Sequence, residues 1–452
     1  MQPCRYQFDQ AFIDGQWESN PVVEVTADGV IASVKTENVV TSERAASERT
    51  TSERTGELKK ISGVALPGMA NLHSHAFQRG LAGLSEFRTA EHDSFWSWRN
   101  QMYQFLQALT PDQVYSISLQ LYRELLASGY TAVGEFHYLH NDADGKQYTR
   151  LSEMAFAVIH AAVDAGIRIC FLPALYQQGG FGESIQPNQR RFYLESESMR
   201  ELIHQVDSEF RAQPLFSMGI ALHSLRAVDL PSGQAMIADF SQQFPGNPIH
   251  IHIAEQTAEV QQCMAATGQR PIEFLFNHFP VDSRWCLVHA THAETYEIGM
   301  MAECGCVVGL CPMTEANLGD GIFPAEQFLQ QGGRFGIGSD SQVSTFWMSE
   351  LRMLEYGQRL QHRRRSILST DQHSTGRTLF ERAAIGGAQA LGLNAGRLAP
   401  GQLADLIIVD PQHPAIGDAR EDRILDRLIF CDQGSPIQKV MINGKLTDPF
   451  FR

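Results

Sequence analysis

Two histidines stand two residues apart in the stretch NLHSHAFQRG, residues 71–80, directly after the apolar run ISGVALPGMA. In a β-strand, residues i and i+2 point to the same face, so His73 and His75 can reach one ion. Imidazole nitrogen is a common ligand of divalent metals, and a bound ion lowers the pKa of its water toward about 7. The pair by itself does not establish a metal site, because a histidine at a strand end is more often a hydrogen-bonded core residue.

Further polar residues follow other strand-like runs. His223 ends FSMGIALH, His252 lies in PIHIHIA with Glu255 three residues on, His289 lies in RWCLVHA, and Asp340 ends RFGIGSD. Histidines with separate structural roles would have no reason to gather at strand ends. Nitrogen ligands with one carboxylate suit Zn²⁺, with Fe²⁺ or Mn²⁺ as alternatives.

His250 shares a face with His252, two residues later in the same run. It lies nearer the start of the predicted strand. We therefore expect His250 to pack in the core or to support a ligand, and not to bind the ion itself.

The middle of the chain, residues 66–391, alternates predicted strands and helices. One unit is TPDQVYSISLQLYRELLASGYTAVGEF, where Thr110 is a predicted N-cap, Pro111 suits the first helical position and Gly129 ends the helix. Eight strands are expected in GVALPGMANLH, TAVGEF, GIRICFLPAL, FSMGIALH, PIHIHIA, RWCLVHA, CGCVVGLC and RFGIGSD. Eight such units favour a TIM-like (β/α)8 barrel, in which functional groups gather at the carboxyl ends of the strands. An open doubly wound sheet is the alternative, but no glycine-rich nucleotide fingerprint follows the first strand.

Both ends of the chain carry hairpin signals. Asp14-Gly15 and Asp28-Gly29 separate apolar runs near the N-terminus, and Asn443-Gly444 does so near the C-terminus. We therefore expect an α/β protein whose barrel, residues 66–391, interrupts a small composite β-sandwich domain made of residues 1–65 and 392–452. Within the first part, Ser-Glu-Arg recurs at 42–44, 47–49 and 52–54, and this five-residue period predicts a solvated loop.

Composition excludes several classes of partner. The formal net charge of −15 argues against nucleic acid or an anionic membrane, and no apolar run reaches the length of a membrane span. Eight cysteines without regular spacing do not form a disulfide framework, so a cytoplasmic location is expected. Cys304, Cys306 and Cys311 lie in an apolar strand-like run and are interpreted as buried small residues. The basic run at residues 361–366 is interpreted as a solvated helix end.

The ligand pattern resembles the amidohydrolase superfamily, and the spacing from His252 to Glu255 resembles its deaminase and chlorohydrolase branch. PGMANLHSHAFQRGLAG, GEFHYLH, ALHSLRAV, IHIHIAEQ and CPMTEANLGDGIFP together look like the formiminoglutamate deiminases of histidine degradation, over nearly the whole chain. The resemblance implies hydrolysis of N-formimino-L-glutamate to N-formyl-L-glutamate and ammonia, and a small dicarboxylate as substrate. Relatives of this architecture commonly pair, so a homodimer is expected.

The resemblance also implies one metal site, with His73, His75, His252 and Asp340 as its ligands and Zn²⁺ or Fe²⁺ as the ion. Two-metal relatives need a bridging lysine on the fourth strand. FSMGIALHSLRAV contains no lysine, which favours a single ion.

Catalytic roles follow from this ligand set. Asp340 can accept the proton of the water, and His289 can hydrogen-bond that water and stabilise the developing oxyanion. Glu255 can carry a proton to the nitrogen that leaves as ammonia, and a pKa raised by burial would suit this role. The alternative for Glu255 is to orient His252.

Substrate carboxylates require cationic partners, and the planar fork of arginine fits them. The candidates are Arg99 in FWSWRNQMY and Arg226 in ALHSLRAV. By resemblance, Gln78, Tyr138 and His223 join them. The alternative is that both arginines pair with acidic residues at the barrel rim.

Two other functions are compatible with the metal ligands. One is an aminohydrolase acting on a purine, pyrimidine or triazine ring, which would need aromatic stacking groups in place of paired arginines. The other is a non-catalytic scaffold that keeps the barrel. A scaffold should lack some ligands, and this chain has them all.

Overall fold

The computed structural model describes residues 3–36, 57–87, 93–431 and 434–447. The Ser-Glu-Arg repeats of residues 42–54 lie outside the described residues, so the predicted solvated loop stays a prediction.

Eight parallel strands form a closed barrel, which confirms the predicted fold and excludes an open sheet. Strand β14 pairs with β6 at Ile337 and Asn71, and β10 pairs with β8, so the ring has no free edge. The barrel strands are β6 (Met69–Ser74), β7 (Tyr130–His137), β8 (Arg168–Leu175), β10 (Ile220–Ser224), β11 (Ile249–Ile253), β12 (Trp285–His289), β13 (Val307–Leu310) and β14 (Arg334–Ile337). A short strand, β9 (Phe216–Met218), precedes β10 and pairs with β8.

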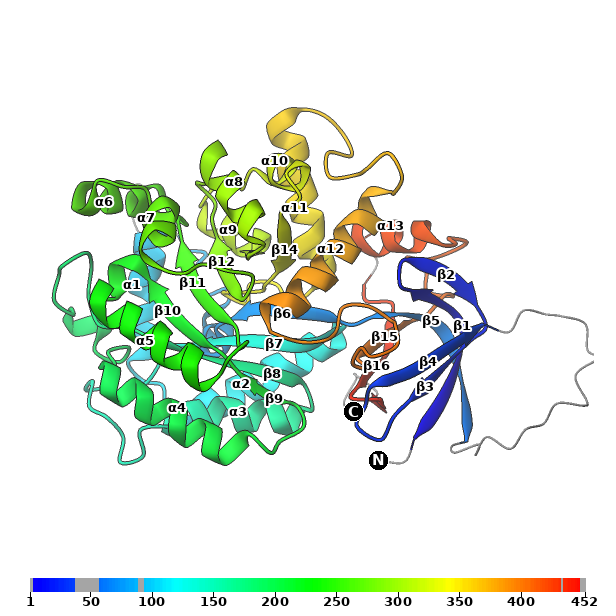
Figure 1. Ribbon diagram of the computed structural model, residues 1–452, viewed down its shortest axis with the longest axis horizontal. Helices are drawn as coiled ribbons and strands as arrows, with labels where there is room; N and C mark the ends of the chain where they lie inside the picture. The colour runs from blue at the N-terminus through cyan, green and yellow to red at the C-terminus, as the bar shows by residue number, and fades with distance from the viewer. Residues whose placement is uncertain (1–2, 37–56, 88–92, 432–433, 448–452) are drawn as a thin grey trace, which may run out of the picture.

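Helices surround the barrel (Figure 1). Helix α2 begins after Thr110, whose side chain accepts the backbone N–H of Gln113, with Pro111 at the first helical position, as predicted. The α-helices are α1 (Phe95–Leu106), α2 (Pro111–Ala127), α3 (Glu153–Ala165), α4 (Ser196–Phe210), α5 (Leu230–Gln243), α6 (Thr257–Thr267), α7 (Pro271–His278), α8 (Thr295–Cys304), α9 (Pro312–Leu318), α10 (Ala325–Gln330), α11 (Trp347–His362), α12 (Thr375–Ala390) and α13 (Asp422–Phe430).

Strands from both ends of the chain share a second sheet beside the barrel (Figure 1). The eight strands form one hydrogen-bonded sheet: β1 (Cys4–Ile13), β2 (Gln16–Ser19), β3 (Pro21–Val25), β4 (Ile31–Thr36), β5 (Leu58–Pro67), β15 (Leu406–Val409), β16 (Ile437–Ile442) and β17 (Lys445–Thr447). The composite β domain is therefore present. The predicted boundaries, 1–65 and 392–452, stay a proposal.

Two of the three predicted hairpins turn as expected. Asp14 and Gly15 have φ of 42° and 81°, and Asn443 and Gly444 have φ of 52° and 73°, which suits two-residue turns. The turn at Asp28-Gly29 is longer, because Val25 pairs with Ile31, and of this dipeptide only Gly29 has positive φ.

Side chains alternate between two cores along the second sheet. Leu406 and Ile408 of β15 pack in a core on one face, whereas Ile407 and Val409 join the large core of the barrel. This alternation follows from the two-residue period of a strand. The sheet is thereby packed against the barrel through every second residue.

The predicted first barrel strand, GVALPGMANLH, is in fact two strands. Strand β5 belongs to the terminal sheet and ends at Pro67, and β6 begins the barrel at Met69. A Cβ atom on Gly68 would lie 2.2 Å from Thr131 Oγ1, so only glycine fits at this change of sheet. In the sequence the two strands form a single apolar run, because the end of β5 and the whole of β6 are buried.

A buried ion pair crosses between the two sheets. Arg168 of β8 donates to Asp405, with Nε–Oδ2 at 2.7 Å and Nη2–Oδ1 at 3.2 Å. Asp405 Oδ1 also accepts the backbone N–H of Asn443. The carboxylate therefore ties the barrel to both C-terminal strands next to it.

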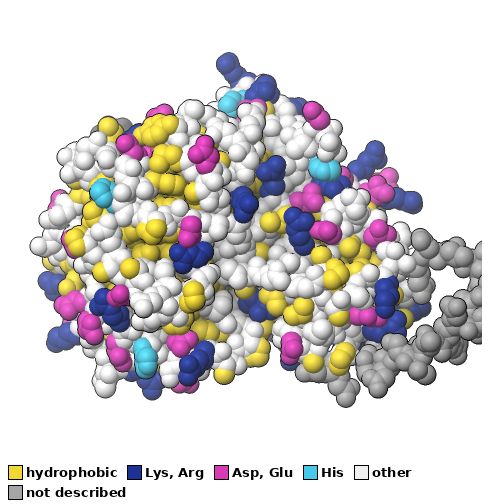
Figure 2. Space-filling view, viewed as in Figure 1, with side chains coloured by type: hydrophobic (Ala, Val, Ile, Leu, Met, Phe, Trp, Pro, Cys, Tyr) yellow, Lys and Arg dark blue, Asp and Glu magenta, His cyan; other side chains and the backbone are white. Residues whose placement is uncertain are grey.

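The surface agrees with the charge analysis. Acidic and basic side chains are interspersed on the face seen in Figure 2. In the described part of the chain, no helix combines the length and the hydropathy needed to cross a bilayer.

We expect Asp405→Ala to lower the free energy of unfolding by about 3–5 kcal/mol, because it leaves the Arg168 guanidinium buried and unpaired. Denaturant unfolding followed by fluorescence measures the change. Arg397→Ala, which breaks the exposed pair with Asp14, is the control and should leave the midpoint nearly unchanged. Equal shifts in the two variants would contradict a special role for the buried pair.

Candidate active site

Three histidines and one aspartate from three strands converge at one end of the barrel. His73 is in β6 and His75 directly follows it, His252 is in β11, and Asp340 follows β14. One ligand atom from each of these four residues lies within 4.8 Å of the others. All four side chains are buried. The sequence-predicted ligand set is thus brought together as a cluster.

Hydrogen bonds to the neighbouring strands fix the imidazole tautomers of two members. His75 Nδ1 lies 2.8 Å from the carbonyl oxygen of Phe136, and His252 Nδ1 lies 2.8 Å from that of His223. A carbonyl only accepts, so each Nδ1 carries the proton and each Nε2 presents a lone pair. The two Nε2 atoms nevertheless lie only 3.3 Å apart.

Facing lone pairs at this distance call for a cation between them. His252 Nε2 also lies 3.0 Å from His73 Nε2, and Asp340 Oδ1 lies 3.3–3.4 Å from the Nε2 atoms of His73 and His75. Two ligands each about 2.1 Å from one tetrahedral ion are about 3.4 Å apart, which matches these separations. The donor set therefore fits a single divalent ion.

The protonation states agree with metal binding. Burial lowers the pKa of His73 to about 3 and also lowers the pKa values of His75 and His252, so the imidazoles are neutral. Burial acts to raise the pKa of Asp340, but the nearby histidines outweigh it and hold this pKa below its usual range. Neutral imidazoles with an ionised carboxylate are the forms that bind metal.

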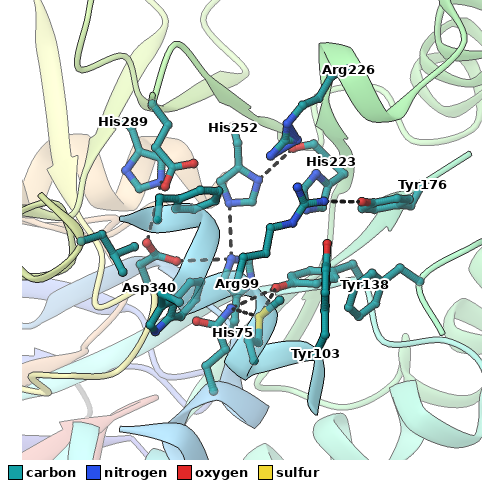
Figure 3. A pocket seen from close by; sticks show the side chains of 17 residues that line it. His75, Arg99, Tyr103, Tyr138, Tyr176, His223, Arg226, His252, His289 and Asp340 are labelled. Carbon is teal, nitrogen blue, oxygen red and sulfur yellow. Dashed lines mark hydrogen bonds and ion pairs between the residues drawn. The ribbon is translucent and has the colours of Figure 1, made fainter. Parts of the chain in front are cut away.

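His289 lies beside this cluster, between carboxylates (Figure 3). Its Nε2 lies 3.7 Å from Asp340 Oδ2 and 3.8 Å from Glu255 Oε1, and its Nδ1 lies 3.3 Å from Glu315 Oε1. Burial lowers the pKa of His289, but the three carboxylates outweigh it and raise the value to about 10. His289 is therefore a buried cation that can donate a hydrogen bond.

Glu255 shares the pocket with the cluster and with His289. Burial raises its pKa to about 7, and the charge of His289 opposes this shift while Asp340 and Glu259 add to it. A carboxyl group with a pKa near neutrality can both take up and release a proton. The His223 carbonyl orients His252. This contact therefore gives no support to the alternative in which Glu255 orients His252.

The predicted substrate-binding residues line the same pocket, which has about 520 Å³ of space including its open mouth. Gln78 donates to the Tyr138 hydroxyl at 2.9 Å, and the His223 ring packs against Tyr138 at a centroid distance of 5.1 Å. The five candidates, Gln78, Arg99, Tyr138, His223 and Arg226, thus line one pocket together with His75, His252 and Asp340. Figure 3 shows four of them, Arg99, Tyr138, His223 and Arg226, around the same space as those three cluster residues.

The two arginines of the pocket have neutral hydrogen-bond partners. Arg99 donates to the Tyr176 hydroxyl at 3.2 Å, and Arg226 donates to Ser224 Oγ at 2.9 Å. The Arg226 Nε has no hydrogen-bond partner within the described residues, although its side chain is buried. These contacts therefore do not show the alternative, in which both arginines pair with acidic residues at the barrel rim. Both guanidinium groups keep N–H donors for an anion.

Sequence reasoning missed the residues that support Arg99. Its guanidinium lies over the rings of Trp96 and Tyr103, at 5.4 and 5.2 Å from their centroids. Tyr176 accepts from Arg99 and also from Gln189, at 3.0 Å. The FWSWR pattern could have indicated Trp96, but Tyr176 and Gln189 carry no local signal.

Two buried glutamates support the site in ways that sequence reasoning did not foresee. Glu315 and Asn317 were expected only as residues that could touch substrate. Glu135 of β7 accepts the Ser74 hydroxyl and the Ala76 N–H, both at 2.7 Å, and so fixes the backbone on either side of His75. Glu315 forms a hydrogen bond with His289 and does not line this pocket. Asn317, another residue of CPMTEANLGDG, donates to Glu86 at the surface.

Backbone conformation at the strand ends is unusual. Asp340 and His289 have φ of 45° and 69°, a region that non-glycine residues seldom occupy. Such strain, of order 1–3 kcal/mol per residue, is typical of functional sites. It turns these two side chains toward the cluster after the regular strand has ended.

His250 is a buried core residue, which is one of the two roles expected for it. It bonds the carbonyl oxygen of Ala390 through Nε2 at 2.7 Å, away from the cluster.

Cys306 and Cys311 are buried free thiols and Cys304 is partly buried. The Cys311 sulfur also lies within 4.8 Å of one nitrogen of His289 and one carboxylate oxygen of Asp340.

Comparison with known proteins supports this picture. The family model described as "Amidohydrolase family" matches residues 64–447. A formimidoylglutamate deiminase of Pseudomonas aeruginosa is 45% identical over 440 residues, which cover 97% of this chain and 93% of the relative.

Solved structures share the architecture. An amidohydrolase from Brucella melitensis is 42% identical, with a TM-score of 0.87, and the match covers 97% of this chain and 93% of the other. An adenosine deaminase from Xanthomonas campestris with bound zinc is 21% identical, with a TM-score of 0.77 over 98% of this chain and 92% of its own, and shows the fold alone.

Proposed function

Because the chain belongs to the amidohydrolase family, we propose that it hydrolyses N-formimino-L-glutamate to N-formyl-L-glutamate and ammonia, a step of histidine degradation. The observation that carries the proposal is the 45% identity to a formimidoylglutamate deiminase over 97% of the chain. The pocket supports it independently, because two guanidinium groups face the His-Asp cluster, and the hydrogen-bond partners found for them among the described residues are neutral hydroxyl groups. The homodimer and the cytoplasmic location expected from the sequence stay predictions.

His73, His75, His252 and Asp340 would hold one divalent ion, with Zn²⁺ preferred and Fe²⁺ compatible. When bound, such an ion lowers the pKa of its water toward about 7 and polarises the amidine carbon. The absence of lysine from β10, whose sequence is IALHS, supports a single ion over a bridged pair.

Three side chains would manage the protons of the reaction. Asp340, ionised because its pKa is held low, accepts the proton of the attacking water. His289, cationic, donates from Nε2 and stabilises the charge that develops on the oxygen. Once the C–O bond to the water oxygen has formed, Glu255, whose pKa burial raises to about 7, delivers a proton to the nitrogen. The C–N bond then breaks, ammonia leaves, and the hydroxyl proton passes back to Glu255 as the formyl C=O forms.

The pocket arginines would bind the two carboxylates of the substrate. Arg226 follows β10 by two residues, Arg99 lies in α1, and both side chains line the pocket. Gln78 and Tyr138 are hydrogen-bonded to each other near His75, so their remaining polar capacity can serve the formimino group or a carboxylate. Arginine is suited to this role because its fork donates two parallel bonds to a carboxylate.

A ring aminohydrolase is the second candidate, because Phe95, Trp98, Tyr103, Tyr176 and Phe192 also line the pocket. Ammonia release separates the two functions. With metal-loaded protein, we expect ammonia from N-formimino-L-glutamate and none above background from guanine. Ammonia from guanine alone would overturn the proposal, and ammonia from neither substrate would favour the non-catalytic scaffold.

Metal removal should abolish activity and lower the melting temperature, because the facing imidazole lone pairs then lose the cation between them. We expect dialysis against a chelator to give this result and one equivalent of Zn²⁺ to restore both properties. Elemental analysis should find about one ion per chain in the wild type and much less in Asp340→Ala. Two tightly held ions per chain would contradict the single-site interpretation.

Glu255→Gln should lower kcat by about 10²–10⁴, because the variant keeps the shape of the pocket and loses the proton carrier. Steady-state kinetics and metal content measured on one preparation check this. A variant with wild-type kcat would exclude Glu255 as the carrier. A variant with depleted metal would instead indicate a role in ligand placement.

Arg226→Met should raise KM for N-formimino-L-glutamate at least about tenfold, because a charge-assisted bond contributes roughly 1.5–3 kcal/mol. Arg211→Met, at the exposed end of α4, is a control that should leave KM unchanged. An unchanged KM in both variants would exclude Arg226 from carboxylate binding.

A further inference from the structure

Glu315 is a buried carboxylate that the catalytic scheme above does not use. It lies in α9, is 4% exposed, and its Oε1 accepts the backbone N–H of Cys311 at 2.9 Å. The same oxygen lies 3.3 Å from His289 Nδ1. Glu315 therefore joins the first turn of α9 to the side chain of His289, on the side away from Glu255 and Asp340.

This contact determines which nitrogen of the His289 ring faces the reaction. A carboxylate only accepts, so Nδ1 must be the donor to Glu315. Nε2 then points between Glu255 Oε1 and Asp340 Oδ2, at 3.8 and 3.7 Å. His289 has a φ of 69°, so regular strand geometry does not hold its ring in this direction.

We propose that Glu315 is a positioning residue, whose hydrogen bond to Nδ1 holds the His289 ring so that Nε2 faces the reacting oxygen. The proposal deepens the proposed deiminase function and rests on it for the identity of the reaction. Glu315 can do this because its side chain is long enough to place an acceptor oxygen beside His289 Nδ1. We therefore expect the length of the side chain at position 315 to affect kcat more than its charge does.

Glu350 offers a matched control in the same part of the fold. Its carboxyl group is fully buried in α11 and accepts the backbone N–H of Met313 at 2.9 Å, so it also supports the first turn of α9. No contact between Glu350 and His289 occurs among the described residues. Substitution at Glu350 therefore tests support of the helix without the contact to the imidazole.

The test separates reach from charge with two small substitutions at each position. Glu315→Asp keeps the charge and withdraws the oxygen by one methylene, whereas Glu315→Gln keeps the reach and removes the charge. We expect kcat to fall about 10–100-fold in Glu315→Asp, with KM little changed, and to fall much less in Glu315→Gln. Glu350→Asp and Glu350→Gln should keep kcat within about threefold of the wild type, whatever they do to the melting temperature.

A double-mutant cycle tests whether Glu315 acts through His289. In a His289→Asn background, Glu315→Asp should cause no further loss of kcat, since effects through one shared group are not additive. Additive losses would overturn the proposal. So would a Glu350→Asp loss equal to that of Glu315→Asp, or a wild-type kcat in Glu315→Asp.

Crystal structures of the variants give a readout that does not depend on the substrate. The His289 ring should turn away from the cluster in Glu315→Asp and keep its direction in Glu315→Gln, with equal metal content in both. An unmoved ring in Glu315→Asp would overturn the proposal. Wild-type protein that fails to release ammonia from N-formimino-L-glutamate would overturn the proposed function and leave this structural result to stand or fall separately.

Discussion

The close approach of imidazole nitrogens at the barrel mouth is the constraint on which the site depends. Carbonyl groups of the neighbouring strands, at Phe136 and His223, hold the protons of His75 and His252 on Nδ1. The bare Nε2 atoms are thereby forced to within 3.3 Å of each other. This arrangement is unfavourable without a cation and favourable with one. The closed ring of strands makes it possible, because it brings β6 and β11 to face each other across the barrel.

Burial and neighbouring charges together give the surrounding groups opposite protonation states. Glu255 has a pKa raised to about 7, whereas the histidines of the cluster have lowered values and His289, among three carboxylates, has a raised one. A low dielectric strengthens each of these effects, since it penalises isolated charge and enhances paired charge. The same buried end of the barrel therefore contains a neutral ligand set, an ionised carboxylate, a cation and a carboxyl group that can exchange its proton.

The proposed recognition of substrate relies on different interactions from those of the His-Asp cluster. The guanidinium of Arg99 is held by aromatic faces and the Tyr176 hydroxyl, and that of Arg226 by Ser224. Neutral hydrogen-bond partners fix the direction of a guanidinium group without neutralising its charge. In a protein with a net charge of −15, such local placement is what makes an anionic substrate acceptable in the pocket.

The sequence by itself determined the barrel and the composite terminal sheet through local patterns of apolar runs and turn residues. The same patterns placed polar side chains at the strand ends, at His73, His75, His223, His252, His289 and Asp340. The choice of His73, His75, His252 and Asp340 as ligands came from the resemblance to the amidohydrolase superfamily. Only the tertiary structure decided that the first predicted strand divides at Gly68 between two sheets, because the space beside Thr131 is a property of the packed chain. It also decided the partners of the functional groups, such as Glu315 on His289 and Tyr176 on Arg99. Those contacts join segments 26 and 77 residues apart, and such pairings leave no periodic trace in the sequence.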